Sequence, residues 1–514
     1  MALLQNWIVV PVAFLLYHIL TIIYRLYFHP LARFPGPKIA AATSWYEAYH
    51  DLKQGGGQFM YKLRELHVIY GPIVRISPEE VHIHDSQWTD ILFSGPAQGK
   101  RDKYAPAASQ AGTPKGVFGT SAHDIHRKRR AALNHLFSKG CATLSENMIY
   151  DKCDLAIRQI HNQITRDGWS EVREVFMAFT TDVVTEYISG KSFGLLGNEA
   201  KTRDWHESIR ALAMAIPVAR QFTWVIPLSL MMPLGLIKKL SPKMARVTGM
   251  HYDMESEARV AVEEHENDEK GAKYNRAPLE RLAVFRTLLL NDALPPSEKQ
   301  YNRISQEAVT IIAAGADTTA SALTTAVYHI CKDKEIILPR LRAEVEHVLP
   351  DESTRPSVVE LERLPYLTAI VKETLRLATL TARLTRVAPD EALQYGDWVM
   401  PPGTAISMTI RNVSLDPEIF PEPKKFVPER WLPINPNLDI CNRYFMAFSK
   451  GTRLCLGMNL AYAELYILLA VLFRRTNYEL YDTVRERDVD FVRDFFVGET
   501  SADSKGVRLR YAAS

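Results

Sequence analysis

One cysteine of this chain lies in a segment whose residue types suit the binding of a metal. The segment reads Phe448-Ser-Lys-Gly451-Thr-Arg453-Leu-Cys455-Leu-Gly457. A cysteine binds metal as the thiolate, which requires a lowered pKa and a water-poor place. A helix predicted to begin soon after Cys455 would present free N–H groups and the positive end of its dipole to the sulfur. The segment therefore predicts a metal–thiolate centre.

The neighbours of Cys455 each have a part in such a centre. Gly451 permits the turn, and Gly457 allows the backbone to lie close to a flat ligand. Arg453 can neutralise a carboxylate, and Phe448 can keep water from the sulfur. The competing interpretation is a buried structural cysteine beside a helix start, the usual fate of a free cysteine.

The spacing of the whole segment resembles the haem-binding signature of the cytochrome P450 monooxygenases, with every fixed position present. Two more motifs follow this family's pattern. Glu373 and Arg376 stand three apart on a predicted helix and so share a face, and Arg430 belongs to a Pro-Glu-Arg segment. Such an ion pair alone is usually solvated and weak. The resemblance implies haem b as the cofactor, Cys455 as the axial ligand of its iron, and a structural role for Glu373, Arg376 and Arg430.

A second chemical motif lies within a long apolar helix predicted from about Ser305 to Cys331. Residues 313–319 read Ala-Ala-Gly-Ala-Asp-Thr-Thr. Glycine costs about 1 kcal/mol relative to alanine in a helix, and an acid is unfavourable in an apolar one. One interpretation is close helix packing through small residues. The other, which the resemblance implies, is a helix that opens locally over the iron, where Thr318 hydrogen-bonds dioxygen and Asp317 relays protons.

Further basic residues are candidates for the two haem propionates. The family most often has a tryptophan four residues before an arginine, and both reach a propionate. Here Arg130 fits that pattern, whereas His126 takes the place of the tryptophan. The resemblance therefore implies a propionate contact for Arg130, with His126 and Arg386 as further candidates.

Composition and cysteine usage limit the class of protein. The 514 residues are 47% hydrophobic and 24% charged, which excludes wholesale disorder. The formal charge of +3 gives no reason to expect nucleic acid as a partner. Five scattered cysteines without a CxxC pair argue against a disulfide scaffold and suit a reducing cytosol.

The N-terminus predicts a membrane anchor. About 18 almost wholly apolar residues run from Trp7 to Tyr24, close to the ~20 that cross a bilayer as a helix. Basic residues follow this stretch and none precedes it, which places the rest of the chain in the cytosol. A cleaved signal peptide is the alternative, but a basic n-region and a clear cleavage site are missing. We expect a single-pass anchor in the endoplasmic reticulum membrane (1–25), a proline-rich hinge (26–37) and a catalytic domain (38–514).

The remaining pattern predicts a mainly α fold with small β-sheets, in which a single large helical domain of the cytochrome P450 type encloses the haem. Strand-like alternation in Ile73–Ile76 and Val81–His84 predicts a hairpin, and Val399–Met408 gives a second hairpin signal. A last helix is expected from about Asn459 to Arg474, with short strands between Val492 and Arg510.

Two segments could be mistaken for domain boundaries. Glu263–Pro278 is charged and is interpreted as an exposed connection. Ala211–Leu236 is strongly apolar, and its prolines at 217, 227 and 233 cut it into pieces too short to span a membrane. We expect a pair of amphipathic helices there, whose tip dips into the membrane interface.

The resemblance predicts a monooxygenase that oxidises a lipophilic small molecule with dioxygen and electrons from NADPH. The expected partner is NADPH–cytochrome P450 reductase, with cytochrome b5 as a second donor, and the chain is expected to be a monomer. A basic face for the donor could be formed by Arg127, Lys128, Arg129 and Lys450; the alternative is a solvated helix surface. The resemblance to the family implies substrate contacts at Tyr104–Phe118, Ala211–Leu236, Ala313, Thr379–Ala382 and Phe496–Gly498.

The substrate is expected from secondary metabolism. The sequence segments at residues 27–37 and 70–76 resemble the corresponding segments of fungal microsomal members of the family, including trichodiene-oxygenase-like ones. A terpenoid is therefore the first expectation, and a polyketide or an alkaloid the second. Two other functions stay open: a haem-thiolate isomerase or dehydratase that needs no reductase, and a non-catalytic haem sensor. Neither would need the Asp317–Thr318 pair.

Overall fold

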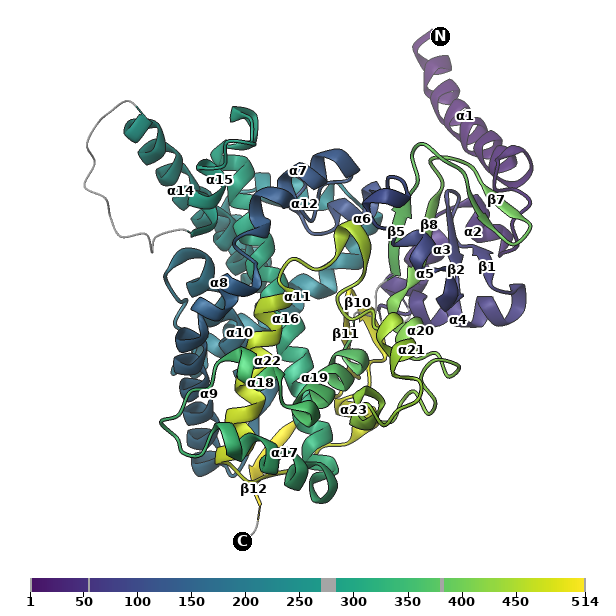
Figure 1. The fold of residues 1–514 in the computed structure, drawn as a ribbon. Coiled ribbons are helices and arrows are strands. Elements are labelled where there is room, and N and C mark those ends of the chain that lie inside the picture. The colour runs from purple at the N-terminus through teal and green to yellow at the C-terminus, as the bar shows by residue number, and fades with distance from the viewer. Residues whose placement is uncertain (1, 54–55, 270–282, 380–382, 513–514) are drawn as a thin grey trace.

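The computed structural model describes residues 2–53, 56–269, 283–379 and 383–512. Helices make up most of the molecule, and the strands form four small sheets (Figure 1). The mainly helical fold with small sheets is thereby confirmed.

The helices of the first half are α1 (Ala2–Ile23), α2 (Lys38–Ala42), α3 (Trp45–Ala48), α4 (Phe59–Tyr70), α5 (Thr89–Leu92), α6 (Ala105–Ser109), α7 (His123–Asn134), α8 (Lys139–Leu144), α9 (Glu146–Asp167), α10 (Val172–Ser189), α11 (Glu199–Gln221), α12 (Val225–Met231), α13 (Leu234–Leu240) and α14 (Pro242–Glu269). Those of the second half are α15 (Ala283–Leu289), α16 (Tyr301–Lys332), α17 (Lys334–Val348), α18 (Val358–Glu362), α19 (Pro365–Leu377), α20 (Ile410–Ser414), α21 (Leu438–Arg443), α22 (Met458–Arg475) and α23 (Arg485–Asp488).

The strands are β1 (Ile73–Arg75), β2 (Glu80–Ile83), β3 (Asp102–Lys103), β4 (Ser170–Glu171), β5 (Arg383–Val387), β6 (Leu393–Tyr395), β7 (Trp398–Met400), β8 (Ala405–Thr409), β9 (Tyr478–Leu480), β10 (Arg493–Phe495), β11 (Val497–Glu499) and β12 (Arg508–Tyr511). Short 3₁₀ or π turns stand at Tyr24–Phe28, Tyr49–Lys53, Ser86–Trp88, Pro96–Gln98, Pro296–Glu298, Pro428–Trp431 and Gly451–Arg453.

Helix α16 runs through the helical core. Its 32 residues span about 48 Å, and it packs mainly against α10 and α14. A Cβ atom at Gly315 would lie 3.0 Å from Cγ2 of Val184 on α10. The two helices are therefore so close at this point that a side chain larger than the hydrogen of glycine would be crowded. Close packing through small residues therefore explains Gly315. The predicted local opening is not observed, because α16 stays helical through residues 313–319.

The main sheet has five strands in the order β1-β2-β8-β5-β3. The hairpin predicted at residues 73–84 is confirmed, since Ile73 pairs with Ile83 in antiparallel register. The hairpin predicted at Val399–Met408 is wrong. Strand β7 instead pairs back with β6, while β8 lies between β2 and β5. The physical reason is burial: every residue of β8 is buried at the centre of a sheet, whereas Val399 of β7 is exposed.

The C-terminal elements follow the expectation, with α22 (Met458–Arg475) and three strands after residue 492. Pro217 does not cut the chain, because α11 continues through it to Gln221. The break comes later, where α11 and α12 meet at an angle of 119°. The predicted connection at Glu263–Pro278 is helical as far as Glu269, and its remainder lies outside the described residues.

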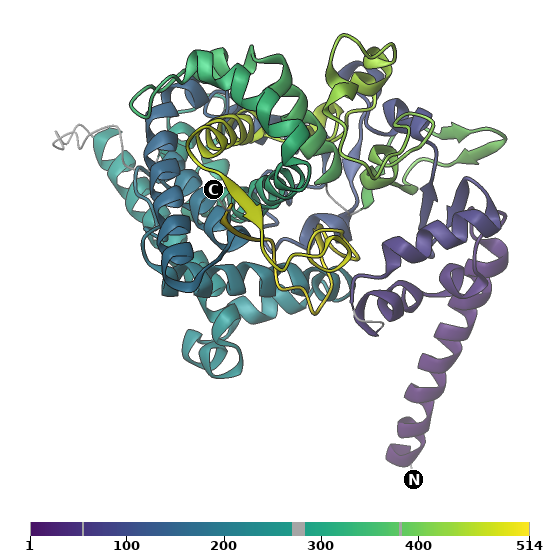
Figure 2. The ribbon, with the colours of Figure 1, turned by 90° about the horizontal axis from the view of Figure 1, so that it is seen from below.

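The N-terminal helix stands apart from the body of the protein in both views (Figures 1 and 2). A window from Val9 to Phe28 has a mean hydropathy of 1.8 and no buried share. Leaving so much apolar surface uncovered is costly in water and favourable in a bilayer. The segment is therefore compatible with a membrane anchor.

Three histidines gather between α4 and the main sheet. His67 Nδ1 lies 2.8 Å from the carbonyl of Gly71, His67 Nε2 lies 2.7 Å from His82 Nδ1, and His82 Nε2 lies 3.0 Å from Oγ1 of Thr409. The ring of His84 meets that of His67 edge-on. All of these hydrogen bonds can form when each of the two rings carries one proton. His67 then donates to Gly71, His82 donates to His67, and Thr409 donates to His82. A second proton on either ring would place a positive charge in this buried site, where desolvation disfavours it, and would require a change of tautomer or a rotation of the Thr409 hydroxyl.

We predict that this histidine chain makes the fold sensitive to acid. Burial lowers the pKa of His67 to about 4 and that of His82 well below its usual 6.5. The unfolded chain therefore binds more protons once the pH drops below about 6.5, and stability falls from there to about pH 4, by roughly 3 kcal/mol for His67. Denaturant unfolding of His82→Gln should show lower stability at pH 7.5 but a smaller loss between pH 7.5 and 5 than the parent. The exposed control His347→Gln should keep the parent's full loss; an equal loss in all three proteins would contradict this account.

Candidate active site

The cysteine segment forms a tight loop directly before α22. Gly451 has φ +71°, and a Cβ atom there would lie 2.4 Å from the carbonyl oxygens of Phe93 and Ser94, so glycine is required. The N–H of Cys455 donates to the carbonyl of Phe448 at 2.9 Å, and Gly457 is the N-cap residue of α22. The loop thus holds Cys455 at the beginning of α22.

The Cys455 thiol is open on one side and enclosed on the others. Its side chain is exposed, yet enough protein surrounds it that burial raises its pKa. The N–H of Gly457 donates to the sulfur, and the charge of Arg130 also lowers the pKa. A coordinated metal ion deprotonates a thiol outright, so the remaining cost of forming the thiolate would be met by a metal on the open side.

Glu373 is the centre of a buried hydrogen-bond network that joins α19 to residues 427–431. Its fully buried carboxylate receives Nε and Nη2 of Arg376, both at 2.8 Å, from the same helix, α19. It also receives Nε of Arg430 at 3.3 Å, Nε1 of Trp431 at 2.9 Å and the N–H of Val427 at 2.9 Å. Breaking a buried pair of this kind costs about 3–5 kcal/mol. The structure thus brings Glu373, Arg376 and Arg430 together as the sequence predicted.

A cluster of basic side chains lies beside the cysteine loop. Arg453 donates to the carbonyls of Thr120 and Ser121, at 2.8 and 2.5 Å, and Arg130 donates to the carbonyl of Leu454. The other members of the cluster, Arg386 and His126, are buried, and each faces the positive charges of its neighbours. Burial and then the charge of Arg453 lower the pKa of Arg386 to about 9, and burial with the surrounding cations lowers that of His126 to about 2.

Lys103 belongs to the same cluster and was missed by sequence reasoning. It pairs with Arg386 across β3 and β5, and its Nζ lies 3.0 Å from the carbonyl of Phe118 and 3.1 Å from the centroid of that ring. Burial, Arg386 and Arg453 hold the pKa of this lysine well below its usual value. Only the register of two distant strands could have revealed it, because Lys103 lies in no motif.

This donor set fits a flat, iron-holding group that carries two carboxylates. For the described part of the chain, Arg386, Arg453 and Lys103 hydrogen-bond to backbone carbonyls, and no ion pair with a carboxylate is found. Buried cations of this kind need anions. A Cβ atom at Gly457 would meet no described atom within 4 Å, so protein packing does not explain that glycine, whereas a flat ligand against it would. Haem, with its two propionates, has the required shape and charge.

Asp317 and Thr318 lie on α16, which packs against α22. Thr318 is partly exposed, and its hydroxyl donates to the carbonyl of Ala314 at 2.9 Å. The carboxylate of Asp317 is buried and receives Nη2 of Arg173 at 3.0 and 3.3 Å. The same Nη2 donates to Glu499 at 2.9 Å. The two neighbours thus have different surroundings: the hydroxyl is accessible, and the acid is held in an ion pair that the sequence did not reveal.

Two aromatic rings from distant segments meet in the region expected to contact substrate. Phe118 and Phe496 are arranged edge to face with centroids 5.8 Å apart. Phe496 forms the tip of the β10–β11 hairpin with φ +76°, a left-handed conformation that is strained for a non-glycine residue. Ala314 is exposed in the middle of a largely buried helix, whereas Thr379 is buried. The other residues of the predicted Thr379–Ala382 contact, 380–382, lie outside the described residues.

The predicted basic face for an electron donor is smaller than expected. Arg129 makes a two-pronged contact with Glu298, at 2.8 and 2.9 Å, and Lys450 pairs with Asp90 at 2.9 Å. Arg127 and Lys128 are exposed on α7. Two of the four residues are therefore held by acids of this chain, and two face solvent.

Comparison with known proteins agrees with this geometry. The family model for cytochrome P450 matches residues 42–502. A cytochrome P450 monooxygenase of Sordaria araneosa, sdnE, is 38% identical over 97% of this chain and 96% of its own. The tryptophan 6-hydroxylase fscE of Fusarium equiseti is 38% identical over 94% and 93%. The N-acetyltryptophan 6-hydroxylase ivoC of Emericella nidulans is 36% identical over 98% and 96%.

The chain belongs to the cytochrome P450 family. It is an oxidoreductase of the monooxygenase class, and its cofactor is thiolate-ligated haem b. The individual roles of Cys455, Arg130, His126, Arg386, Arg453, Asp317 and Thr318 stay predictions, which the geometry makes specific enough to test.

We predict that Lys103→Met acts in opposite directions with and without haem. Without the propionates, the variant removes an unpaired buried charge, so the haem-free protein should unfold at a higher temperature. With haem bound, it removes a charge-assisted contact worth about 1.5–3 kcal/mol, so haem should transfer to apomyoglobin at least about tenfold faster. The control is Lys100→Met, since Lys100 is exposed and pairs with Asp124. Unchanged haem transfer in Lys103→Met would remove Lys103 from the cofactor site.

Proposed function

We propose that this chain is a membrane-anchored monooxygenase that oxidises a lipophilic small molecule in fungal secondary metabolism. The observation that carries the proposal is the cysteine loop beside a buried basic cluster whose members Arg386, Arg453 and Lys103 form no ion pair with a carboxylate of the described residues. In this proposal Cys455 ligates the iron, and Arg130, His126, Arg386 and Arg453 surround the propionates. The names of fungal relatives, including two tryptophan-type hydroxylases, support a tailoring role.

The chain's own residues would then have distinct tasks around the cofactor. Bound haem would supply the iron at which dioxygen is reduced and activated toward a C–H bond. The Gly457 N–H and Arg130 would stabilise the negative charge of the Cys455 sulfur. The Thr318 hydroxyl would donate a hydrogen bond toward dioxygen, and Asp317 would supply protons to it. Phe118 and Phe496 would hold the substrate and exclude water.

The surroundings of the catalytic domain fit a protein attached to the endoplasmic reticulum. We propose a single-pass anchor in residues 1–25, a hinge in 26–37 and a cytosolic catalytic domain in 38–514. Exposed apolar side chains on and beside α12 and α13 would dip into the same membrane surface; they are Trp224, Leu228, Met231, Leu234, Leu236 and Leu240. A monomer would receive electrons from NADPH–cytochrome P450 reductase, or from cytochrome b5, at the face of α7 with Arg127 and Lys128.

We predict that the reduced protein gives the thiolate-type Soret shift with carbon monoxide and that Cys455→Ala abolishes it. Cys441→Ala serves as the control, since Cys441 is buried away from the loop near Asn435. Product formation should require both the NADPH-dependent reductase and dioxygen. An isomerase or dehydratase would turn over a peroxide without reductase, and a sensor would give no product. Survival of the shift in Cys455→Ala would overturn the ligand assignment.

We propose a terpenoid as the first substrate class, because the segments at residues 27–37 and 70–76 resemble trichodiene-oxygenase-like members of the family. An indole acid is the second candidate, favoured by the edge-to-face pair of Phe118 and Phe496 and by the names of two relatives, which are tryptophan-type hydroxylases. We predict a saturable spin-state shift of the Soret band on titration with a sesquiterpene hydrocarbon. N-acetyltryptophan is the comparison ligand. A shift with N-acetyltryptophan alone, weakened severalfold by Phe118→Leu, would replace the terpenoid with an indole acid.

A further inference from the structure

A groove of about 1080 Å³ lies between α4, α20 and α21. The turn before β1, the residues after β2, strand β6 and the chain from residue 415 to 424 complete its walls, so the lining lies outside the cysteine loop and α16. Figure 1 shows α20 and α21 on the part of the body away from the free end of α1. A ligand of this groove would therefore come from the surrounding solution rather than from a bilayer around α1.

The side-chain amide of Asn412, on α20, carries an unsatisfied donor in the wall of the groove. Its oxygen accepts Nε of Arg64 at 2.9 Å. An arginine can only donate, so the oxygen of this amide must face Arg64, and the amide nitrogen Nδ2 is left as a donor. Asn412 is 8% exposed, and its Nδ2 is buried without a hydrogen-bond partner among the described residues. Because buried donors are nearly always paired in native proteins, this one is suited to an acceptor from outside the chain.

The guanidinium group of Arg64 lies beside this donor and carries a charge without a partner. Its Nε is bound to Asn412, and its centre lies 5.9 Å from the ring centroid of Tyr61. Within the described residues, no carboxylate forms an ion pair with Arg64, and burial lowers the pKa of its guanidinium group. The charge of Arg64 in turn helps to lower the pKa of His84, another residue of the groove. Arg64 and Asn412 thus offer neighbouring donors to a single anion.

The acids of the groove are engaged elsewhere and restrict which anion fits. Asp85 accepts the hydroxyl of Tyr395 at 3.0 Å, and Asp416 accepts the hydroxyl of Ser86 at 2.5 Å. Their negative charges disfavour an anion with more than one charge, such as phosphate. A carboxylate carries one charge, and its two oxygens match the planar fork of an arginine. The charges of the groove therefore select a monocarboxylate.

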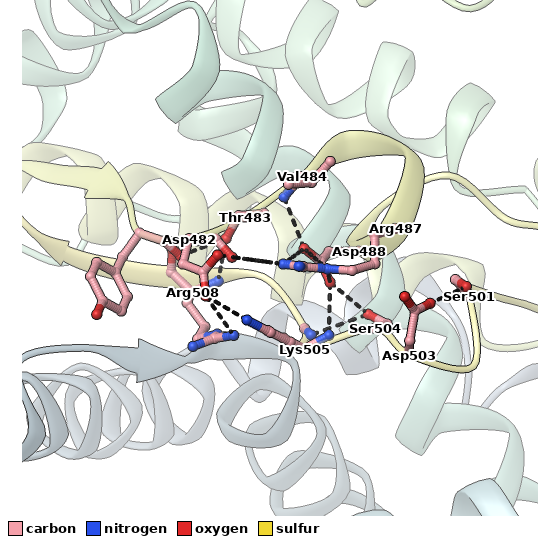
Figure 3. Close-up of polar contacts among 12 residues, drawn as sticks. Asp482, Thr483, Val484, Arg487, Asp488, Ser501, Asp503, Ser504, Lys505 and Arg508 are labelled. Atoms are coloured by element: carbon pink, nitrogen blue, oxygen red, sulfur yellow. Dashed lines mark hydrogen bonds and ion pairs between the residues drawn. The ribbon is translucent and has the colours of Figure 1, made fainter.

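The charged loop near the C-terminus shows the contrasting case, in which acids and cations of the same chain match. Asp488 accepts the Lys505 N–H at 2.7 Å and Nη2 of Arg487 at 2.7 Å, and Asp482 pairs with the ammonium of Lys505 at 2.9 Å (Figure 3). That loop is balanced by its own residues. Arg64 has no such acid beside it, which is why the groove is the candidate for an anionic ligand.

The rest of the lining is largely apolar and is held in place. Its apolar residues include Pro72, Leu415, Pro417, Ile419, Pro423 and Tyr444. Arg376 donates to the carbonyls of Ser414 and Pro423, at 2.8 and 2.7 Å, and so fixes both ends of one wall. A pre-formed apolar surface with a few placed polar groups is the usual make-up of a small-molecule site.

We propose that this groove binds a small organic carboxylate, a molecule with one carboxylate and a compact apolar body. The carboxylate accepts the free N–H groups of Arg64 and Nδ2 of Asn412, which supplies the acceptor that the buried amide lacks. The apolar body lies against the prolines and Tyr444. The site is separate from the proposed haem site, so the two can be occupied at the same time.

The experiment titrates 4-fluorophenylacetate into the full-length holoenzyme and follows its binding by ¹⁹F NMR. A saturating amount of 4-phenylimidazole is present throughout, so that the substrate region is already filled. Asn412→Asp keeps the oxygen that faces Arg64 and replaces the Nδ2 donor with a second oxygen, and Arg64→Gln removes the charge. Asn162→Asp is the control, because it adds the same negative charge at an exposed position on α9.

The parent and Asn162→Asp should bind the acid saturably with a Kd of about 1 mM. Asn412→Asp and Arg64→Gln should each bind at least about tenfold more weakly, since each removes a charge-assisted contact. The neutral 4-fluorophenylacetamide should also bind at least about tenfold more weakly to the parent, and inorganic phosphate should compete poorly with the acid. If Asn412→Asp does not reach the helical circular dichroism of the parent, Arg64→Gln decides.

Equal affinity of the acid for the parent and for both groove variants would refute the site, as would the absence of saturable binding to the parent. Equal binding of the acid and the amide, or phosphate that competes as strongly as the acid, would refute the carboxylate as the ligand class.

Discussion

The buried carboxylate of Glu373 is the interaction on which the rest of the site depends. Its two oxygens accept five donors from three places in the chain: α19, the residue at 427 and the Pro428–Trp431 turn. An ionised carboxylate without exposed surface is tolerated only when it is fully paired. That requirement fixes the long irregular segment before the cysteine loop against α19. The cysteine loop, which follows about twenty residues later, therefore starts from a segment that is held in place.

Within the described residues, the positive charges of Arg386, Arg453 and Lys103 beside the cysteine loop form no ion pair with a carboxylate, which fits an anionic cofactor. Burial lowers the pKa of both Arg386 and Lys103, the charge of Arg453 lowers both further, and the charge of Arg386 also lowers that of Lys103. On the other side of the cofactor region the balance is internal, since Arg173 and Arg210 meet Asp317 and Glu499. The first cluster is thus suited to an anionic ligand, whereas the second pairs its acids with arginines of the same chain. The two clusters have similar residues and opposite electrostatic roles.

Much of the site was predictable because its residues are neighbours in sequence. The turn at Gly451, the start of α22 after Cys455 and the Glu373–Arg376 pair all depend on spacings of a few residues. The errors arose where distant segments compete for pairing. Strand β8 was expected to pair with β7, but it lies buried between β2 and β5. The helix through Pro217 persisted, because tertiary packing outweighed the local cost of proline.

By itself, the sequence determined the cysteine loop, the acid–alcohol pair on a long helix, the apolar N-terminal segment and the class of helical fold. Each of these depends on local periodicity, on glycine conformations or on fixed spacing along one helix or loop. Three contacts of the site depend on how the chain packs: Lys103 with the basic cluster, Asp317 with Arg173, and Phe118 with Phe496. Asp317 and Arg173 are 144 positions apart in the sequence, and Phe118 and Phe496 are 378 positions apart. The free energy of such contacts depends on burial. Burial is a property of the packed molecule, and no local stretch of sequence contains it.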